Sequence, residues 1–462
     1  MSRLRSLTLP LLAVLLVVLA AGAAWAGPGQ HRARLSRDVA DHLEAGRAGT
    51  VQVIVRGERA ALQELAARHG LAAKRWLARG VVLEATPGQL EALAADPEVP
   101  AVSGDAVVRS TMAVTAEAIG TALVRAGVGG ARGLTGRGIG IAVVDSGISA
   151  LPALRDRVVA SVDFTGTSSA VRDTYGHGTH VAGIIAAAAD ATQPVVTERY
   201  EGVAPGAHLV SLRVLDGEGA GRTSDVIRAI DWAVANKARY AIRVLNLSLG
   251  HPVFEPAADD PLCEAVERAV AAGIVVVAAA GNMGKADDGT PIIAGIESPG
   301  NSPYAITVGA LNTKQTSGRS DDVLATYSSR GPAAYDLTIK PDLVAPGNRI
   351  VSLESPGATL IAEYPSLHVA GSGTRAYMQM SGTSMSAAVV SGAAALLLEA
   401  NPALSVLQVK AALQMGATFL PEAGLLGAGA GSLNVAASVA VATDGPEALA
   451  DLELAGETVS PS

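Results

Sequence analysis

Hydrophobic positions repeat at two different periods along the chain, and their arrangement changes near residue 110. Between Thr50 and Ser110, short apolar or alternating runs typical of strands are separated by segments with apolar residues at helical spacing. The pattern predicts strand, helix, strand, helix and strand, in that order, over Val51–Arg56, Glu58–His69, Gly80–Ala85, Thr86–Ala95 and Val99–Val108. We therefore expect a small α+β domain in this part of the chain.

A Gly-rich, weakly patterned stretch from Thr111 to Arg137 follows, and beyond it strands that are apolar throughout alternate with helical segments. The predicted strands are Gly140–Asp145, Leu209–Leu215, Ala241–Leu249, Ile274–Ala279 and Ala305–Val308. The predicted helices are Thr179–Ala189, Thr223–Asn236, Asp260–Ala272, Met385–Ala400 and Ser405–Met415. This alternation favours an α/β domain with a parallel sheet covered by helices on both faces. In such sheets the functional residues gather at the carboxyl ends of the strands.

The two ends of the chain differ from the rest. Arg3 and Arg5 precede an apolar run from Leu7 to Ala21, which small residues close through Ala26. This is typical of a secretory signal, whereas the alternative, a membrane anchor, needs about 20 apolar residues. After Thr443 the chain is acidic and poor in large apolar residues, so we expect a flexible tail. The predicted divisions are a signal peptide (1–26), the α+β domain (27–110, core 50–108), the α/β domain (111–442) and the tail (443–462).

Composition narrows the choice of partners. Hydrophobic residues make up 49% of the chain but aromatic residues only 3%, so the core must consist of small aliphatic side chains close to glycines. A net charge of -8 argues against nucleic acid as a partner. We expect a monomer with no membrane association after removal of the signal. The single cysteine, Cys263, cannot form an internal disulfide, and its place in a helical pattern favours a buried thiol.

Three short segments carry reactive side chains among small neighbours, at strand ends or helix starts. They contain Asp145 in Val144–Gly147, His177 in Gly176–His180 and Ser384 in Ser381–Met385. A serine hydroxyl becomes a good nucleophile when a base removes its proton, and a histidine base works best when a carboxylate fixes its tautomer. Asp145 alone is more simply explained as a cap or turn residue and Ser384 alone as a helix N-cap, but the combination favours catalysis.

Two further patterns indicate structure rather than chemistry. His180 lies one turn after His177 and could be a metal partner, but such pairs also arise from packing, so we expect a structural role. The glycines Gly136, Gly138 and Gly140 suggest a dinucleotide-binding loop. Such a loop follows a strand and opens a helix, whereas these glycines precede a strand, which excludes it.

The three reactive segments resemble the active-site motifs of the subtilase family, in that family's order of acid, base and nucleophile. Other matching motifs are Asn246–Gly250, Ala279–Asn282, Tyr327–Pro332 and Lys340–Gly347, so the resemblance covers about residues 133–440. It implies a subtilisin-like fold and a serine endopeptidase that cleaves proteins or peptides through an acyl-enzyme. The triad would be Asp145, His177 and Ser384, and Asn282 would donate to the oxyanion.

The chain departs from the family's pattern in places, and other classes of protein are alternatives to a subtilase. Ser386–Val389 lack the proline and histidine that commonly follow the serine, and the loop Ala189–Tyr200 has no clear carboxylate cluster. We therefore expect no cofactor, and structural calcium, frequent in relatives, is unsupported. A serine-carboxyl peptidase would lack the His177 segment. A silent peptide-binding relative or a storage exoprotein would not need an intact triad with Asn282.

The resemblance also implies how a substrate would bind. An extended peptide would pair with the backbone edges of two segments, whose residues are Ser248, Leu249, Gly250, Ala279, Ala280 and Gly281. Glu297 would lie near the base of the pocket for the residue before the cut bond, where a carboxylate favours Lys or Arg; a surface glutamate on a loop is the alternative. Residues 50–110 resemble the family's inhibitory propeptide, so we expect residues 27–110 to be an intramolecular inhibitor, cut at Arg109 and therefore secreted as a zymogen.

Overall fold

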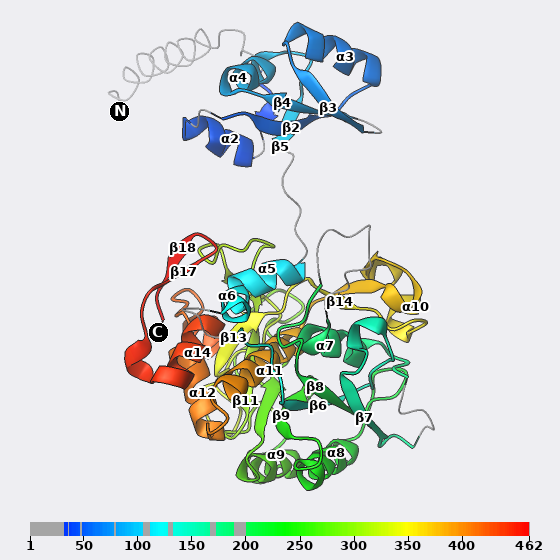
Figure 1. Ribbon diagram of the computed structural model, residues 1–462, viewed down its shortest axis with the longest axis vertical. Coiled ribbons are helices and arrows are strands. Elements are labelled where there is room, and N and C mark those ends of the chain that lie inside the picture. The colour runs from blue at the N-terminus through cyan, green and yellow to red at the C-terminus, as the bar shows by residue number, and fades with distance from the viewer. Residues whose placement is uncertain are drawn as a thin grey trace, which may run out of the picture. The chain divides into compact units, whose positions relative to one another are not determined.

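The computed structural model describes residues 32–35, 37–46, 49–77, 80–104, 111–127, 133–166, 172–188 and 200–461. The chain forms two compact units, which divide between Val108 and Arg109 (Figure 1). The predicted signal peptide and the predicted cut at Arg109 lie outside the described residues. The boundary falls within two residues of the one that the sequence pattern predicts.

The first unit is a small α+β domain, as predicted. Its sheet has the order β1-β5-β2-β4-β3, with bounds Arg34–Leu35 (β1), Val51–Val55 (β2), Ala72–Leu77 (β3), Gly80–Ala85 (β4) and Ala101–Gly104 (β5). Its helices are Arg37–Glu44 (α2), Arg59–Arg68 (α3) and Pro87–Ala95 (α4). Apolar residues of the sheet and of these helices form one core of its own.

Local signals in this unit explain what the sequence predicted and what it missed. Thr86 begins α4 as a capping box, because its side chain accepts from the Gln89 amide while the Gln89 side chain accepts from the Thr86 amide. The pattern missed β1, α2 and β3. Strand β3 has no clear alternation and a bulge between Ala73 and Arg75, so its pairing with β4 defines it as a strand.

The second unit is built on a sheet with the order β12-β11-β10-β9-β6-β8-β7, in which β13 also pairs with β11. All of its pairings are parallel except that of the two-residue strand β12. The bounds are Gly140–Asp145 (β6), Val158–Asp163 (β7), His208–Arg213 (β8), Ile242–Leu247 (β9), Val275–Ala279 (β10), Ile306–Asn312 (β11), Val323–Leu324 (β12) and Leu343–Pro346 (β13). All five predicted strands are present, and the predicted parallel sheet is confirmed.

Helices cover both faces of this sheet. They are Thr111–Ala118 (α5), Thr121–Ala126 (α6), His177–Ala186 (α7), Thr223–Asn236 (α8), Pro261–Ala271 (α9), Thr359–Glu363 (α10), Thr383–Ala400 (α11), Val406–Met415 (α12), Gly424–Ala428 (α13) and Val435–Asp444 (α14). Side chains of β6 alternate between two cores: Ile141 and Val143 join the core of α7 and α11, and Ala142 and Val144 join that of α8 and α9.

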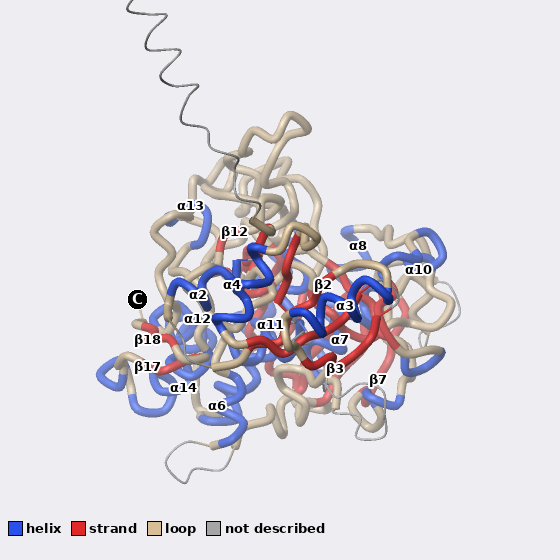
Figure 2. Tube along the Cα trace, turned by 90° about the horizontal axis from the view of Figure 1, so that it is seen from above, coloured by secondary structure: helices blue, strands red, loops and turns tan. Residues whose placement is uncertain are grey.

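Helix α11 lies at the centre of the second unit (Figure 1 and Figure 2). Its residues from Thr383 to Leu398 are all buried, and many of them are alanines that let it approach β9, β10 and β11 closely. It is long and apolar enough to cross a membrane, but 83% of that stretch is buried inside this unit. It is therefore a core helix of this unit, and its alanines agree with the core of small aliphatic side chains that the low aromatic content predicts.

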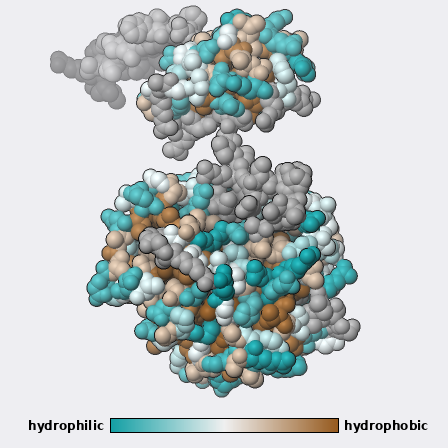
Figure 3. All heavy atoms as spheres, in the orientation of Figure 1, coloured by the Kyte–Doolittle hydropathy of each residue, from teal (hydrophilic) through white to brown (hydrophobic). Residues whose placement is uncertain are grey.

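Smaller elements complete the second unit. A three-stranded sheet with the order β14-β16-β15 comprises Ile350–Leu353 (β14), His368–Ala370 (β15) and Tyr377–Met380 (β16). On the face seen in Figure 3, apolar and polar residues are interspersed over this unit. Short 3₁₀ turns at Pro152–Leu154, Pro365–Leu367, Gly373–Arg375 and Pro446–Ala448 connect the longer elements.

The prediction of a flexible tail after Thr443 is wrong for the described residues. Leu452–Leu454 (β17) and Glu457–Val459 (β18) form a hairpin, in which Leu454 and Val459 are buried. The Glu457 carboxylate accepts hydrogen bonds from the Arg319 amide (2.6 Å), the Ser320 amide (3.0 Å) and the Ser320 hydroxyl (2.7 Å). Leu454, Val459 and the Glu457 carboxylate thus hold this hairpin on the second unit, although the composition of the segment alone indicated disorder.

Replacing Glu457 by alanine should lower the stability of the second unit by about 1–2 kcal/mol, because three hydrogen bonds to a carboxylate are lost. The hydrogen bond from Ser320 holds the pKa of Glu457 below its usual value. The difference from wild type should therefore be full at neutral pH and shrink as the pH falls through the folded pKa. Thermal unfolding at pH 7 and at pH 4 measures both effects.

Glu453→Ala is the matched control, since Glu453 lies in the same hairpin and accepts a hydrogen bond from Thr458 across it. Equal melting temperatures for the two variants would contradict the anchoring role of Glu457.

Candidate active site

The site begins at the carboxyl ends of three neighbouring strands. Asp145 is the last residue of β6, Ser248 follows β9, and Asn282 follows β10 by three residues. Since these strands are parallel and adjacent, their ends meet at one edge of the sheet. Tertiary structure therefore brings together residues that lie more than 100 positions apart in the sequence.

Asp145 and His177 form a hydrogen-bonded pair. The His177 Nδ1 lies 2.8 Å from Oδ1 and 2.9 Å from Oδ2 of Asp145, which is fully buried. His177 is the first residue of α7, and the first turn of this helix approaches the loop after β6 closely. A Cβ at Gly178 would lie 2.2 Å from the Gly147 carbonyl oxygen, so this contact requires glycine.

A second carboxylate, Asp173, supports this pair, and the sequence analysis missed it. Its Oδ1 accepts from the Gly176 amide (2.7 Å) and the Ser146 hydroxyl (2.9 Å), and its Oδ2 accepts from the Thr179 amide (2.8 Å). Asp173 therefore caps the start of α7 and, through Ser146, connects it to the end of β6. The signal available in the sequence was an aspartate, Asp173, shortly before the helix that begins at His177.

The ionisation of His177 reflects opposing influences. Burial by itself lowers the pKa of His177, while the carboxylates of Asp145 and Asp173 raise it, and the result lies above the ordinary value. His180 differs, since burial and the nearby His177 lower its pKa to about 3. Its Nε2 lies 3.2 Å from the Ile350 carbonyl oxygen, so it is a neutral core residue, as predicted.

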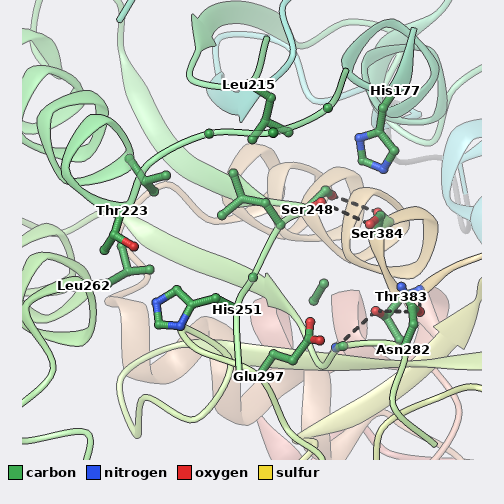
Figure 4. A pocket seen from close by; sticks show the side chains of 18 of the residues that line it. His177, Leu215, Thr223, Ser248, His251, Leu262, Asn282, Glu297, Thr383 and Ser384 are labelled. Atoms are coloured by element: carbon green, nitrogen blue, oxygen red, sulfur yellow. Dashed lines mark hydrogen bonds between the residues drawn. The ribbon is translucent and has the colours of Figure 1, made fainter. Parts of the chain in front are cut away.

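Ser384 lies in the first turn of α11. The amide groups of this turn point out of the N-terminal end of the helix, which faces the cleft. Its hydroxyl donates to the Ser248 carbonyl oxygen (3.0 Å), and the Ser248 hydroxyl donates to the Ser384 carbonyl oxygen (2.9 Å). Ser384 and His177 line the same cleft (Figure 4).

Asn282 is oriented by Thr383. Its Oδ1 accepts hydrogen bonds from the Thr383 amide (3.0 Å) and the Thr383 hydroxyl (3.3 Å). Because the backbone amide requires an acceptor, the side-chain oxygen faces Thr383 and the NH₂ group is left for the cleft. His177, Ser384 and Asn282 lie along the right-hand side of the cleft in Figure 4.

The cleft has a volume of about 450 Å³. Six of the seven predicted substrate-binding residues line it: Ser248, Leu249, Gly250, Ala279, Gly281 and Glu297. Ala280 does not, because it is buried and its amide and carbonyl bond to Val308 and Glu297. The sequence analysis missed several lining residues on other loops, which are Tyr175, Leu215, Gly219, Ala220, Gly221, Arg222, Thr223, Val226, His251 and Leu262.

The family model described as "Subtilase family" matches residues 136–439, which is more than half of the chain. The chain belongs to the subtilase family. It is accordingly a serine-type endopeptidase, and its substrates are proteins or peptides. The resemblance that the motifs carried in the sequence is confirmed.

Individual relatives agree with this assignment. The serine protease AprX of Bacillus subtilis (strain 168) is 37% identical over 311 residues, or 66% of this chain and 67% of that protein. An alkaline protease of Alkalihalobacillus alcalophilus is 35% identical over 347 residues, or 75% of this chain and 76% of the relative. The solved structure of Sphericase has a TM-score of 0.50 and 30% identity, and the match covers 64% of this chain and 89% of that one.

The described part of this subtilase contains no group of three or more His, Cys, Asp or Glu side chains able to hold a metal ion. Residues 189–199, most of the loop in which calcium was considered, lie outside the described residues. Cys263 is a buried free thiol, as predicted, and burial raises its pKa to about 12. That thiol therefore stays protonated at neutral pH.

Replacing Asp173 by asparagine should reduce kcat by about tenfold, because an amide can accept on one oxygen only and the start of α7 loses part of its cap. The change also removes a carboxylate that raises the pKa of His177. The ionisation seen in the profile of kcat/KM against pH should therefore move to lower pH. That shift separates a positioning role from general loss of stability.

Asp163→Asn is the control, since Asp163 ends the edge strand β7 and its carboxylate caps a local turn at Thr165. An unchanged pH profile in Asp173→Asn, with both variants folded, would contradict the assigned role.

Proposed function

We propose that this subtilase is a secreted, self-processing endopeptidase whose nucleophile is Ser384, whose base is His177 and whose orienting acid is Asp145. The observation that carries the proposal is the buried Asp145–His177 pair, which shares one cleft with Ser384 and the free amide of Asn282. The raised pKa of His177 suits an imidazole that must take up a proton during the reaction.

In the proposed reaction, the Ser384 hydroxyl turns from the Ser248 carbonyl to His177 and attacks the scissile carbonyl carbon. His177 takes the hydroxyl proton and returns it to the leaving amine, and Asp145 stabilises the imidazolium. The oxyanion is stabilised by the Asn282 amide and the first-turn amides of α11. Water then attacks the acyl-enzyme with His177 again as the base, which releases the acid product and restores the Ser384 hydroxyl.

Maturation is proposed on separate grounds. The first unit has its own core and ends at the boundary near residue 108, and residues 1–26 carry a secretory pattern. We propose that the signal is removed on export and that residues 27–110 inhibit the enzyme until it cuts the chain near Arg109. The mature enzyme would then begin between Ser110 and Met112 and act outside the cell as a monomer, free of the membrane and without a cofactor.

The mass and N-terminal sequence of the secreted product test self-processing. Wild type should begin between Ser110 and Met112, whereas Ser384→Ala should remain full length after signal removal. Ser391→Ala is the control, since this serine lies on the same helix and its hydroxyl donates to Asn246. Equal trimming of wild type and Ser384→Ala would assign maturation to another protease.

A fluorophosphonate probe, which phosphonylates an activated serine with loss of fluoride, distinguishes the enzyme from a silent peptide-binding relative. Wild type and Ser391→Ala should be labelled on Ser384, and Ser384→Ala should not. A folded wild-type protein that resists labelling would contradict the catalytic proposal itself.

We further propose that Glu297 favours Lys or Arg before the cut bond. The carboxylate is partly buried, which raises its pKa, and it contacts the cleft wall closely. A Cβ at Gly281 would lie 2.7 Å from the Glu297 Cγ, so glycine leaves the pocket open to this side chain. A basic side chain entering the pocket would form an ion pair with the carboxylate.

Glu297→Gln should reduce kcat/KM for a substrate with Arg or Lys at that position by about 10- to 100-fold, and far less for a substrate with Leu. Glu255→Gln, an exposed glutamate nearby in the sequence, serves as the control. Equal loss on basic and apolar substrates would refute the preference.

A further inference from the structure

A second titratable side chain, His251, lines the pocket that contains Glu297. The loop that contains His251 and the loop that contains Glu297 pair there through backbone hydrogen bonds. The His251 amide donates to the Ser298 carbonyl (3.0 Å), and the Ser298 amide donates to the His251 carbonyl (2.8 Å). His251 is thus paired with the residue that follows Glu297. Figure 4 shows both side chains in the lower part of the cleft, away from His177.

The His251 ring is held in one orientation by two contacts. Its Nδ1 lies 2.8 Å from the Pro252 carbonyl oxygen, and its ring stacks on Phe254 with centroids 5.7 Å apart and planes 10° from parallel. A carbonyl oxygen can only accept, so Nδ1 carries a hydrogen in both charge states. The change of charge therefore occurs at Nε2.

Other charged or titratable groups lie around this pair. Tyr175, His177 and Arg222 line the same cleft. Behind the pocket, Asp260 accepts from the Ser298 hydroxyl (2.5 Å) and from the Cys263 thiol (3.5 Å). The charge that acts on Glu297 is that of His251, which opposes the effect of burial on the carboxylate.

We propose that His251 is a specificity-determining residue that makes the preference for Lys or Arg depend on pH. With a neutral imidazole and an ionised Glu297, the pocket carries one negative charge and favours a basic side chain. With a protonated imidazole, the pair has no net charge, and the basic side chain also meets a like charge. The preference for a basic side chain should therefore be stronger at alkaline pH than at acidic pH.

The ionisation of Glu297 acts in the same direction. Burial raises the pKa of this carboxyl, so that lowering the pH also favours its neutral form. The two changes give a pocket charge of about -1 at alkaline pH and of zero or above at acidic pH. This inference rests on the proposed function, because it assumes that the residue before the cut bond enters this pocket.

The test compares two peptides that differ only in the residue before the cut bond, Arg or Leu. The mature enzyme is assayed from pH 5.5 to 9, and the ratio of the two kcat/KM values is recorded. The ionisation of His177 affects both substrates and cancels in the ratio. In wild type the ratio should rise about tenfold from pH 5.5 to pH 8.

Variants separate the contributions. His251→Lys carries a fixed positive charge and should give a low ratio up to pH 8, whereas His251→Gln should give a high ratio whose remaining pH dependence is that of Glu297 alone. His368→Gln is the control, since His368 bonds to the Glu354 carboxylate (2.7 Å) and does not line the cleft. Its ratio should follow that of wild type.

A flat ratio in wild type, or an identical rise in wild type and His251→Gln, would overturn the inference. Failure of the proposed function looks different, because neither peptide would then be cleaved and the fluorophosphonate would not label Ser384.

Discussion

The Asp145 carboxylate is fully buried at the end of the central strand, and a buried charge is stable in a protein only when hydrogen bonds replace its water. Those hydrogen bonds come from the Ser146 amide and the His177 ring. Each donor therefore has to stay in place for the buried carboxylate oxygens to keep their hydrogen bonds. The geometry of the site and the packing around it both serve to hold these hydrogen-bond donors against the buried Asp145 carboxylate.

Close packing at the sheet edge keeps these hydrogen-bond donors in place. Helix α7 begins where Asp173 caps it, and Gly178 allows its first turn to touch the loop after β6. Helix α11 approaches the same edge through its small buried side chains and brings Ser384 to the cleft. A chain with few aromatic residues suits this arrangement, because helices with alanine surfaces can lie nearer to a sheet.

Charge is distributed unevenly along the cleft. At one end, the carboxylates of Asp145 and Asp173 raise the pKa of His177 and favour its protonated form. At the other end, Glu297 is partly buried, which raises its pKa, and His251 lines the same cleft. In the proposed function, chemistry and side-chain selection involve two different sets of histidine and carboxylate. The first set is hydrogen-bonded and its carboxylate is fully buried, whereas the second lines the cleft.

The sequence by itself determined the α/β class, the strands β6, β8, β9, β10 and β11 of the main sheet, and the three reactive segments. It could do so because periodicity and motif spacing are local properties. It also located Asn282 and six of the seven predicted substrate-binding residues through the family resemblance. Tertiary structure alone decided that Asp173 supports His177, that Ala280 is buried behind the cleft, and that His251 lies beside Glu297. The same is true of the terminal hairpin, whose Glu457 binds a loop more than 100 residues earlier. These contacts depend on which loops meet at a sheet edge, and neither composition nor periodicity encodes the distance between residues far apart in the chain.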